Sequence, residues 1–236
     1  MKSYRLLVAF ILSITLTHSL RADLVNYVTN GSFESAGGSF SGWTTTGSTS
    51  ISTTSFSAPT DGSFKAFISN SSGSVAASVL STFFGGAILP ANGGGNAIEG
   101  SGIKQTFTAP GPAELYFDYR YVSQEDIHSG YDETFFFLDG DVTLLTDSDT
   151  AGVIPISGLP LRYKNGTAYR TVKVSLSAGT HTVGFGSYDT GDASGDSALI
   201  LDNIQAIPEP ATVMFGVGLG LAGLVTSTAR RRRVRA

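Results

Sequence analysis

The chain of 236 residues contains no cysteine, so no disulfide bond can stabilise it. A domain without disulfides depends on an apolar core, on a bound metal ion, or on both. Charged residues are also scarce, at 14% of the chain, whereas glycine and proline number 29 and 8. This composition argues against a helix-rich fold, because glycine and proline disfavour helix interiors, and it suits many short strands joined by turns.

Basic residues are few in the body of the chain. Residues 23–207 hold 7 Lys and Arg against 18 Asp and Glu, a formal net charge of 7 − 18 = −11. An acidic body of this kind argues against nucleic acids and anionic membrane surfaces as partners. It leaves divalent cations open as ligands.

The first 22 residues have the layout of a secretory signal peptide. Lys2 and Arg5 precede an apolar stretch from Leu6 to Leu16, and Ala22 is a plausible cleavage position. We therefore expect export through the Sec machinery. The alternative is a helix of the folded protein at the N-terminus.

The last 26 residues predict a single transmembrane helix. Ala211 to Ala229 contains no charged residue, and its 19 residues would span about 28 Å as a helix, close to the thickness of a bilayer core. Five arginines follow, which the positive-inside tendency keeps in the cytoplasm: Arg230, Arg231, Arg232, Arg233 and Arg235. This topology places the acidic body outside the cytoplasmic membrane.

Residues 208–236 together resemble the PEP-CTERM sorting signal of exopolysaccharide-associated Gram-negative bacteria. The resemblance rests on three parts in order, namely Pro208-Glu209-Pro210, the apolar helix and the arginine cluster. It implies that the membrane helix is an inner-membrane intermediate. An exosortase would cut near Pro-Glu-Pro and pass the protein to the cell surface or extracellular matrix. The alternative is a permanent single-pass anchor.

The body, residues 23–207, shows the period-two alternation of half-buried strands. In Ala113–Tyr121 the apolar Leu115, Phe117, Tyr119 and Tyr121 share one face, and Tyr169–Leu176 alternates in the same way. Turn sequences such as Asp139-Gly140 separate such runs, and no segment shows a convincing helical stripe. The pattern predicts an all-β fold, an antiparallel β-sandwich or jelly roll.

Two short motifs resemble the galactose-binding-like jelly rolls, which include several carbohydrate-binding modules. Asn30-Gly31-Ser32-Phe33-Glu34, followed by Gly42-Trp43, is similar to the opening of such domains, and Leu199-Ile200-Leu201-Asp202-Asn203-Ile204 is similar to their closing strand. The motifs cover under a tenth of the body. The resemblance implies that the first and last strands lie near each other.

The same resemblance implies a structural calcium ion between these strands. Carried over by position, Glu34 and Asp202 would be its carboxylate ligands, and backbone carbonyls would complete the oxygen shell that Ca²⁺ requires. The alternative is that Glu34 caps a loop and Asp202 pairs with a nearby backbone amide.

Aromatic residues are candidates for carbohydrate contact, because sugar C–H faces stack on rings while polar loop groups take the hydroxyls. The candidates are Trp43, Tyr116, Tyr121 and Tyr131. For Trp43, the lone tryptophan, packing in the core is the favoured alternative.

Catalysis finds little support. His181 shares strand parity with Val183 and Phe185, so a partly buried role is favoured over a general base, and His128 lies in a polar run. The segment Gly195–Ala198 resembles a serine-protease nucleophile segment, but no matching His or Asp segment accompanies it. Clusters of carboxylates could serve a glycosidase or bind calcium weakly. They are Glu125-Asp126, Asp132-Glu133, Asp139/Asp141, Asp147/Asp149 and Asp189/Asp192/Asp196.

The sequence therefore favours a non-catalytic exported protein of the cell surface or matrix, associated with exopolysaccharide and structural or adhesive in role. Two alternatives stay open. One is a carbohydrate-binding module for the cell's own exopolysaccharide, and the other, less favoured, is an envelope glycoside hydrolase.

Overall fold

The computed structural model describes residues 25–86, 97–127, 132–150, 152–156, 163–191 and 194–209. The predicted signal peptide and transmembrane segment lie outside these residues, as do Tyr131, His128, Pro210 and the five C-terminal arginines. None of the helices within the described ranges has the length and apolar character needed to cross a bilayer.

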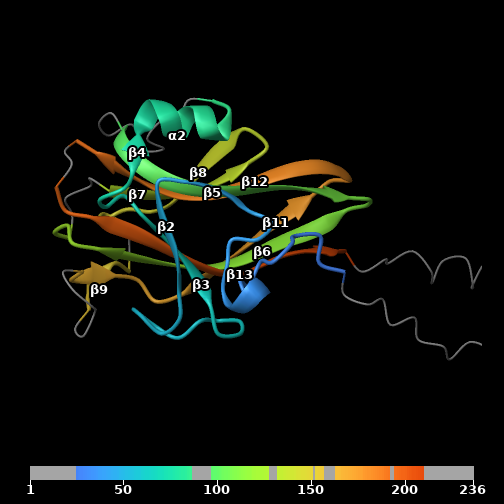
Figure 1. The fold of residues 1–236 in the computed structure, drawn as a ribbon, viewed down its shortest axis with the longest axis horizontal. Coiled ribbons are helices and arrows are strands. Elements are labelled where there is room, and N and C mark those ends of the chain that lie inside the picture. Colours follow the sequence, from blue (N-terminus) through green and yellow to red (C-terminus); the bar gives the residue numbers. More distant parts are fainter. Residues whose placement is uncertain are drawn as a thin grey trace, which may run out of the picture.

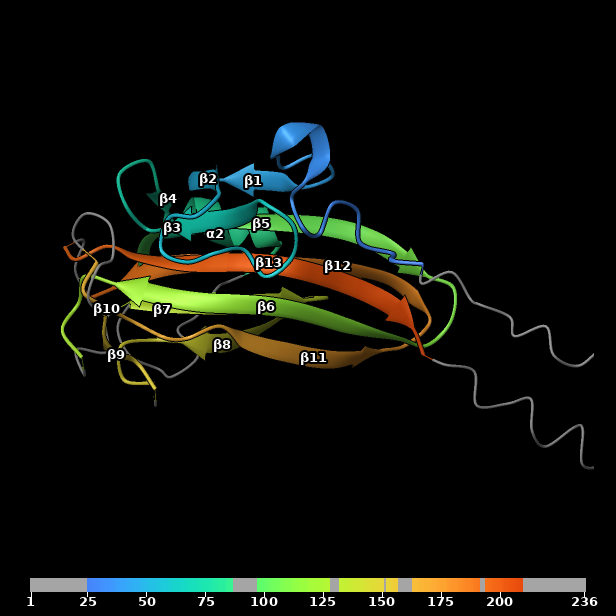
Figure 2. The ribbon, with the colours of Figure 1, turned by 90° about the horizontal axis from the view of Figure 1, so that it is seen from below.

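Two antiparallel sheets pack face to face, which confirms the predicted all-β sandwich (Figures 1 and 2). The six-stranded sheet has the order β1 (Thr44–Thr46), β5 (Ala97–Ala109), β12 (Gly179–Thr190), β7 (Asp132–Leu138) and β8 (Asp141–Thr146), with β4 (Val75–Ala76) paired to β5. The seven-stranded sheet has the order β2 (Ser48–Ser52), β3 (Lys65–Ser69), β13 (Ser197–Pro208), β6 (Ala113–Ser123), β10 (Asn165–Gly166) and β9 (Ile154–Pro155), with β11 (Arg170–Leu176) paired to β6.

The apolar core lies between the sheets, where alternate residues of each strand point inward. On β6 these are Leu115, Phe117 and Tyr119, as the alternation predicted. Phe117 contacts Phe185 of β12 edge-on, with ring centroids 4.8 Å apart. Such aromatic contacts across the sandwich stabilise it without disulfides.

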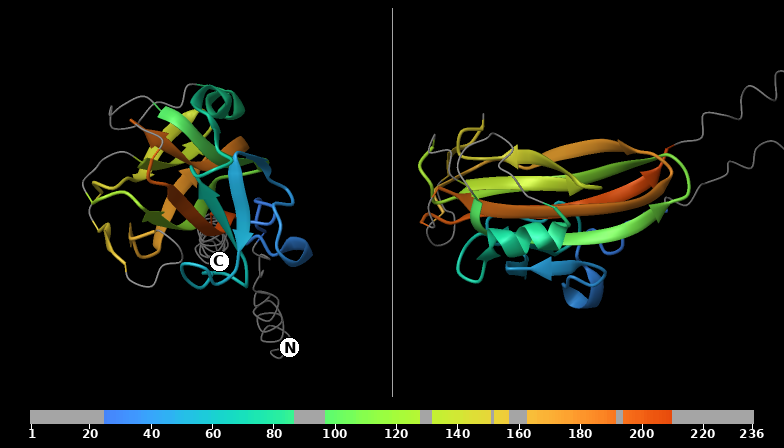
Figure 3. Two further views of the ribbon diagram at one scale, coloured as in Figure 1. Left: turned by 60° about the vertical axis from the view of Figure 1, so that its left-hand side comes forward. Right: turned by 90° about the horizontal axis from the view of Figure 1, so that it is seen from above.

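One helix, α2 (Ala77–Phe84), was not expected from the sequence. Its Leu80 and Phe84, four residues apart, pack with Phe135, Phe137 and Tyr188 on the outer face of the six-stranded sheet (Figure 3). A helix of two turns is too short to show an apolar stripe in the sequence. Its stability therefore comes from packing against the sheet rather than from local sequence preference. A 3₁₀ turn, η1 (Ser35–Gly37), lies in the opening segment.

The opening segment and the closing strand lie side by side, as the jelly-roll resemblance implies. Tyr27 N donates to Ala206 O at 2.8 Å, and Ile204 N donates to Gly31 O at 3.0 Å. The pairing of β13 with β6 is interrupted between Asp202 and Gln205. The described chain therefore begins and ends at the same end of the sandwich.

Candidate functional site

A groove of about 330 Å³ lies on the outer face of the seven-stranded sheet. Strand parity creates it: Ala66 and Ile68 of β3 point into the core, so Phe67 between them points outward, beside Ser50 of β2. The described residues that line the groove are Ser50, Ile51, Ser52, Ser55, Phe56, Phe67, Ser71 and Tyr163. None of them is charged, and four of the eight are serines with hydroxyl groups.

Three rings form the aromatic part of the groove. Phe56 stacks on Phe67, with centroids 5.0 Å apart and planes inclined by 11°. Tyr163 meets Phe56 edge-on at 5.3 Å, and its hydroxyl lies 3.3 Å from Ser69 Oγ. Phe56 and Phe67 are half-buried, so part of each ring stays accessible to a ligand.

Phe56 is held in an unusual backbone conformation. Its φ is 70°, a left-handed value that a bulky residue rarely adopts and that costs free energy. Such a conformation persists only where surrounding contacts impose it. Arg120 supplies one of them, because its Nη1 donates to Phe56 O at 2.5 Å.

Lys65 is a second cation beneath the loop that connects β2 to β3, residues 53–64. Its side chain is buried, and Nζ donates to the carbonyls of Thr53 and Ser57, on either side of Phe56. Burial lowers the pKa of Lys65, and the charge of Asp202 partly offsets this. The buried Lys65 and the half-buried Arg120 therefore both bind backbone carbonyls of the loop and fix the position of Phe56.

Two carboxylates hold the second half of the same loop. Asp202 Oδ2 accepts from Thr60 N at 2.7 Å and from Asp61 N at 2.9 Å. Glu34 Oε1 accepts from Ser63 N and Phe64 N, both at 2.7 Å. Burial raises the pKa of Asp202 to about 6, although its amide hydrogen bonds act in the opposite direction. The loop is thus bound by two cations and two anions.

These contacts bear on the predicted calcium site. The groups that face Glu34 Oε1 and Asp202 Oδ2 are backbone N–H donors and the hydroxyl of Thr60, whose positive ends occupy the positions that a cation would need. These contacts agree with the alternative in which Glu34 caps a loop and Asp202 binds a nearby backbone amide. Calcium binding by Glu34 and Asp202 stays a prediction, but hydrogen bonds to these two oxygens disfavour it. The Asp202→Asn variant tests it.

Trp43 and Tyr121, two of the predicted carbohydrate contacts, are buried, which corrects the prediction for both. Trp43 is 8% exposed, packs on Phe33, and donates from Nε1 to Asn30 O at 3.1 Å. Tyr121 is fully buried between the sheets. A sugar cannot stack on either ring, because each already fills the interior of the fold.

The other two predicted contacts lie elsewhere. Tyr116 is half-buried on the outer face of β6, where Lys173 Nζ lies 5.3 Å from its ring centroid. Its hydroxyl donates to Glu114. Tyr116 is not among the residues that line the groove. Tyr131 falls outside the described residues.

The sequence prediction missed Phe56, Phe67 and Tyr163. The alternation in Lys65–Ser69 could have placed Phe67 on an outer face, because its two neighbours are small or aliphatic. Phe56 lies in a run of Ser and Thr, where no periodic pattern marks it. Its role follows from the loop contacts alone.

The groups considered for catalysis are engaged in the fold. His181 Nδ1 lies 2.7 Å from Asp139 Oδ2, and its Nε2 lies 2.9 Å from Ser177 O. Ser197 is fully buried, and its Oγ donates to Asp132 Oδ2 at 2.7 Å and lies 2.7 Å from Ser123 Oγ. In the part of the chain that the structure describes, no three His, Cys, Asp or Glu side chains are grouped to hold a metal ion.

A comparison with protein families matches residues 206–233 to the PEP-CTERM protein-sorting motif. This confirms the resemblance seen at the C-terminus and marks an exported protein that an exosortase handles at the membrane. A comparison with curated proteins found no match.

The fold is similar to several solved structures. One is TmCBM61 in complex with β-1,4-galactotriose, at 11% identity and a TM-score of 0.43, covering 78% of this chain and 99% of that one. Another is the K1 cleaved adhesin domain of Lys-gingipain from Porphyromonas gingivalis W83, at 15% identity and a TM-score of 0.38, covering 72% and 92%. A third is CBM35 from Cellvibrio japonicus Abf62, at 14% identity and a TM-score of 0.23, covering 47% and 72%. At these TM-scores the ligands of those proteins are not carried over to this chain.

Proposed function

We propose that this protein is a non-catalytic exported β-sandwich, which an exosortase sorts to the cell surface or extracellular matrix and which binds exopolysaccharide there. The groove on the outer face of the seven-stranded sheet is the proposed binding site. The observation that carries the proposal is its combination of partly accessible rings and serine hydroxyls, at a surface whose loop is fixed by four charged side chains.

The lining of the groove suits a sugar chain. The C–H faces of a pyranose pack on aromatic rings such as Phe56 and Phe67, while Ser50, Ser52 and Ser55 offer hydroxyls to the sugar. Because the loop is already ordered by its anchors, little conformational entropy is lost when a ligand binds. The site is therefore built for binding rather than for bond cleavage.

The hydrolase alternative lacks a comparable feature. Among the residues that the structure describes, no carboxylate lines the groove, although a glycosidase needs a pair of them flanking the scissile bond. Release of reducing ends from exopolysaccharide by the purified protein would contradict the non-catalytic part of the proposal.

The test is affinity electrophoresis of the mature protein through gels that contain exopolysaccharide from the producing cells. We expect retardation of the wild type, and an affinity about 3- to 10-fold lower for Phe67→Ala, because one ring contact contributes about 0.5–1.5 kcal/mol. Phe83→Ala is the matched control, since Phe83 lies on α2 outside the groove. Equal retardation of wild type and Phe67→Ala would overturn the groove as the binding site.

A further inference from the structure

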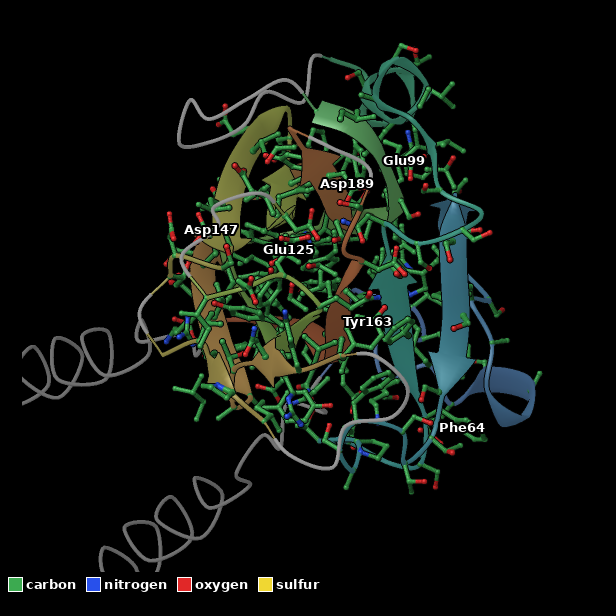
Figure 4. All side chains as sticks on the ribbon, turned by 90° about the vertical axis from the view of Figure 1, so that its left-hand side faces the viewer. Phe64, Glu99, Glu125, Asp147, Tyr163 and Asp189 are labelled. Atoms are coloured by element: carbon green, nitrogen blue, oxygen red, sulfur yellow. The ribbon has the colours of Figure 1, made fainter. Side chains whose placement is uncertain are left out.

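At one end of the sandwich the space between the sheets is polar rather than apolar. Strand parity continues the inward face of β7 through Thr134 to Asp132, and that of β12 through Ser187 to Asp189. The buried Ser197 of β13 faces them from the other sheet, where its hydroxyl bonds to Asp132. Figure 4 looks onto this end, where Asp189 lies with Glu99, Glu125 and Asp147.

Asp132 and Asp189 form a buried carboxylate pair. They are opposite each other on β7 and β12 and are only 1% and 3% exposed. Two neighbouring buried carboxylates repel each other when both are ionised. Burial raises the pKa of both residues, and for Asp189 the neighbouring Asp132 adds to this effect.

The surroundings of the pair supply neutral donors and further negative charge. Asn70 Nδ2 donates to Asp189 Oδ1, and Ser197 Oγ donates to Asp132 Oδ2 at 2.7 Å. The charged groups that act most strongly on the pair are carboxylates, namely Glu99, Glu125 and Asp196. A buried anionic pair in such surroundings requires a compensating positive ligand, which can be a proton or a metal cation.

Ser187 gives an independent indication of a ligand. Its Oγ is fully buried and has no hydrogen-bond partner among the described residues. Ser187 precedes Asp189 by two residues on β12, so both side chains lie on the same inward face. A buried hydroxyl without a partner destabilises the fold, and a cation held by the neighbouring carboxylates would remove this penalty.

We propose that Asp132, Asp189 and Ser187 bind a hard divalent cation, with Ca²⁺ as the ion whose chemistry fits best. Ca²⁺ prefers oxygen ligands, tolerates irregular geometry and accepts carboxylate, hydroxyl, amide and water oxygens together. A bound cation would compensate the negative charge of the two buried carboxylates and give the hydroxyl of Ser187 a partner. The site goes beyond the proposed polysaccharide binding, since it lies between the sheets and not in the groove. It also differs from the predicted site at Glu34 and Asp202.

The proposal is tested by calorimetric titration of Ca²⁺ into the mature protein after treatment with a chelator. We expect one Ca²⁺ per chain, and an affinity at least about 100-fold lower for Asp189→Asn. Two matched controls should bind as the wild type does. Asp126→Asn removes an exposed carboxylate paired with Lys164, and Asp202→Asn removes the ligand predicted from the sequence.

Thermal unfolding provides a second test, which applies even if the heat of Ca²⁺ binding is too small to measure. The amide of Asp189→Asn can donate to Asp132 as a neutral acid does, so this variant should melt in chelator at or above the wild-type temperature. Ca²⁺ should raise the melting temperature of the wild type and of Asp202→Asn, and leave that of Asp189→Asn unchanged. The proposal is overturned if the wild type gives neither heat nor a shift, if Asp189→Asn responds like the wild type, or if Asp202→Asn alone loses the response.

Discussion

Gly31, within the opening motif Asn30–Glu34, is required by its distance from the closing strand. A Cβ added at Gly31 would lie 1.9 Å from Ile204 O, and that carbonyl belongs to the backbone of β13. Neither segment can move without breaking the hydrogen bond from Ile204 N to Gly31 O. We therefore expect Gly31→Ala to lower the free energy of unfolding by about 3 kcal/mol or more. For a chain of this size the melting temperature should fall by about 6–12 °C.

Gly111→Ala is the matched control for this substitution. A Cβ at Gly111 meets no heavy atom within 4 Å, and Gly111 is not among the glycines with positive φ. Its melting temperature should stay within about 2 °C of the wild type. Equal losses in the two variants would show that the contact with Ile204 is unimportant.

His181 gives the fold a pH dependence at the scale of one residue. Burial lowers its pKa, but hydrogen bonds to Asp139 and to Ser177 O outweigh burial, so the pKa is raised above 6.5. The charged pair therefore stabilises the fold fully below about pH 6.5, and this contribution is lost as the pH rises through the raised pKa. Asp139 is 43% exposed, so screening by solvent limits the contribution to less than about 1 kcal/mol.

The measurement is urea unfolding of the wild type and of Asp139→Asn between pH 5.5 and 8.5. Asparagine tolerates the positive φ of residue 139, which is 53°, so the substitution removes mainly the charge. The stability advantage of the wild type should shrink as the pH rises. An advantage that is constant or grows with pH would contradict the assignment.

The loop of residues 53–64 is the element on which the groove depends, and Lys65 is its buried anchor. Lys65→Met keeps the length of the side chain but leaves the carbonyls of Thr53 and Ser57 without their donor, at a cost of about 1–3 kcal/mol. We expect this variant to lose affinity for exopolysaccharide at least as much as Phe67→Ala. Chymotrypsin should also cut after Phe56 faster than in the wild type.

Lys104→Met is the control at the same scale. Lys104 Nζ also donates to a backbone carbonyl, that of Phe83 on α2, and it lies 4.6 Å from the ring centroid of Phe83. Its loss disturbs α2 but not the groove. If Lys65→Met bound polysaccharide like Lys104→Met, the loop would not position the binding site.

The strands could be predicted from the sequence, but the groove could not. The alternation of apolar and polar residues in β6 and β11 is a local pattern, so the sequence alone predicts which of their residues face the core. The jelly-roll resemblance implied that the strands carrying Glu34 and Asp202 lie near each other. It did not show that both carboxylates bind the loop of residues 53–64, because the donors that face them belong to Thr60–Phe64, far away in sequence. Phe56 and α2 depend on tertiary contacts, which override weak local preferences.

At the scale of the whole molecule, the sorting motif and the fold share residues. The matched motif begins at residue 206, whereas β13 continues to Pro208, which pairs with Ala113. Glu209 N also donates to Pro112 O at 3.0 Å. The end of the sandwich is therefore built from the first residues of the signal that the exosortase reads.

This overlap predicts where processing can take place. Removal of residues 206–208 would leave Ala113–Leu115 of β6 paired with β11 alone and would free Tyr27, which donates to Ala206 O. Such a loss exposes backbone groups at a sheet edge, which favours aggregation. We therefore expect the mature chain to start between residues 23 and 27 and to end at or after Pro208. Mass spectrometry of the protein from the cell surface and culture medium measures both ends. A C-terminus before Ala206 would contradict the structural argument, and an intact tail from Arg230 to Ala236 would contradict sorting by an exosortase.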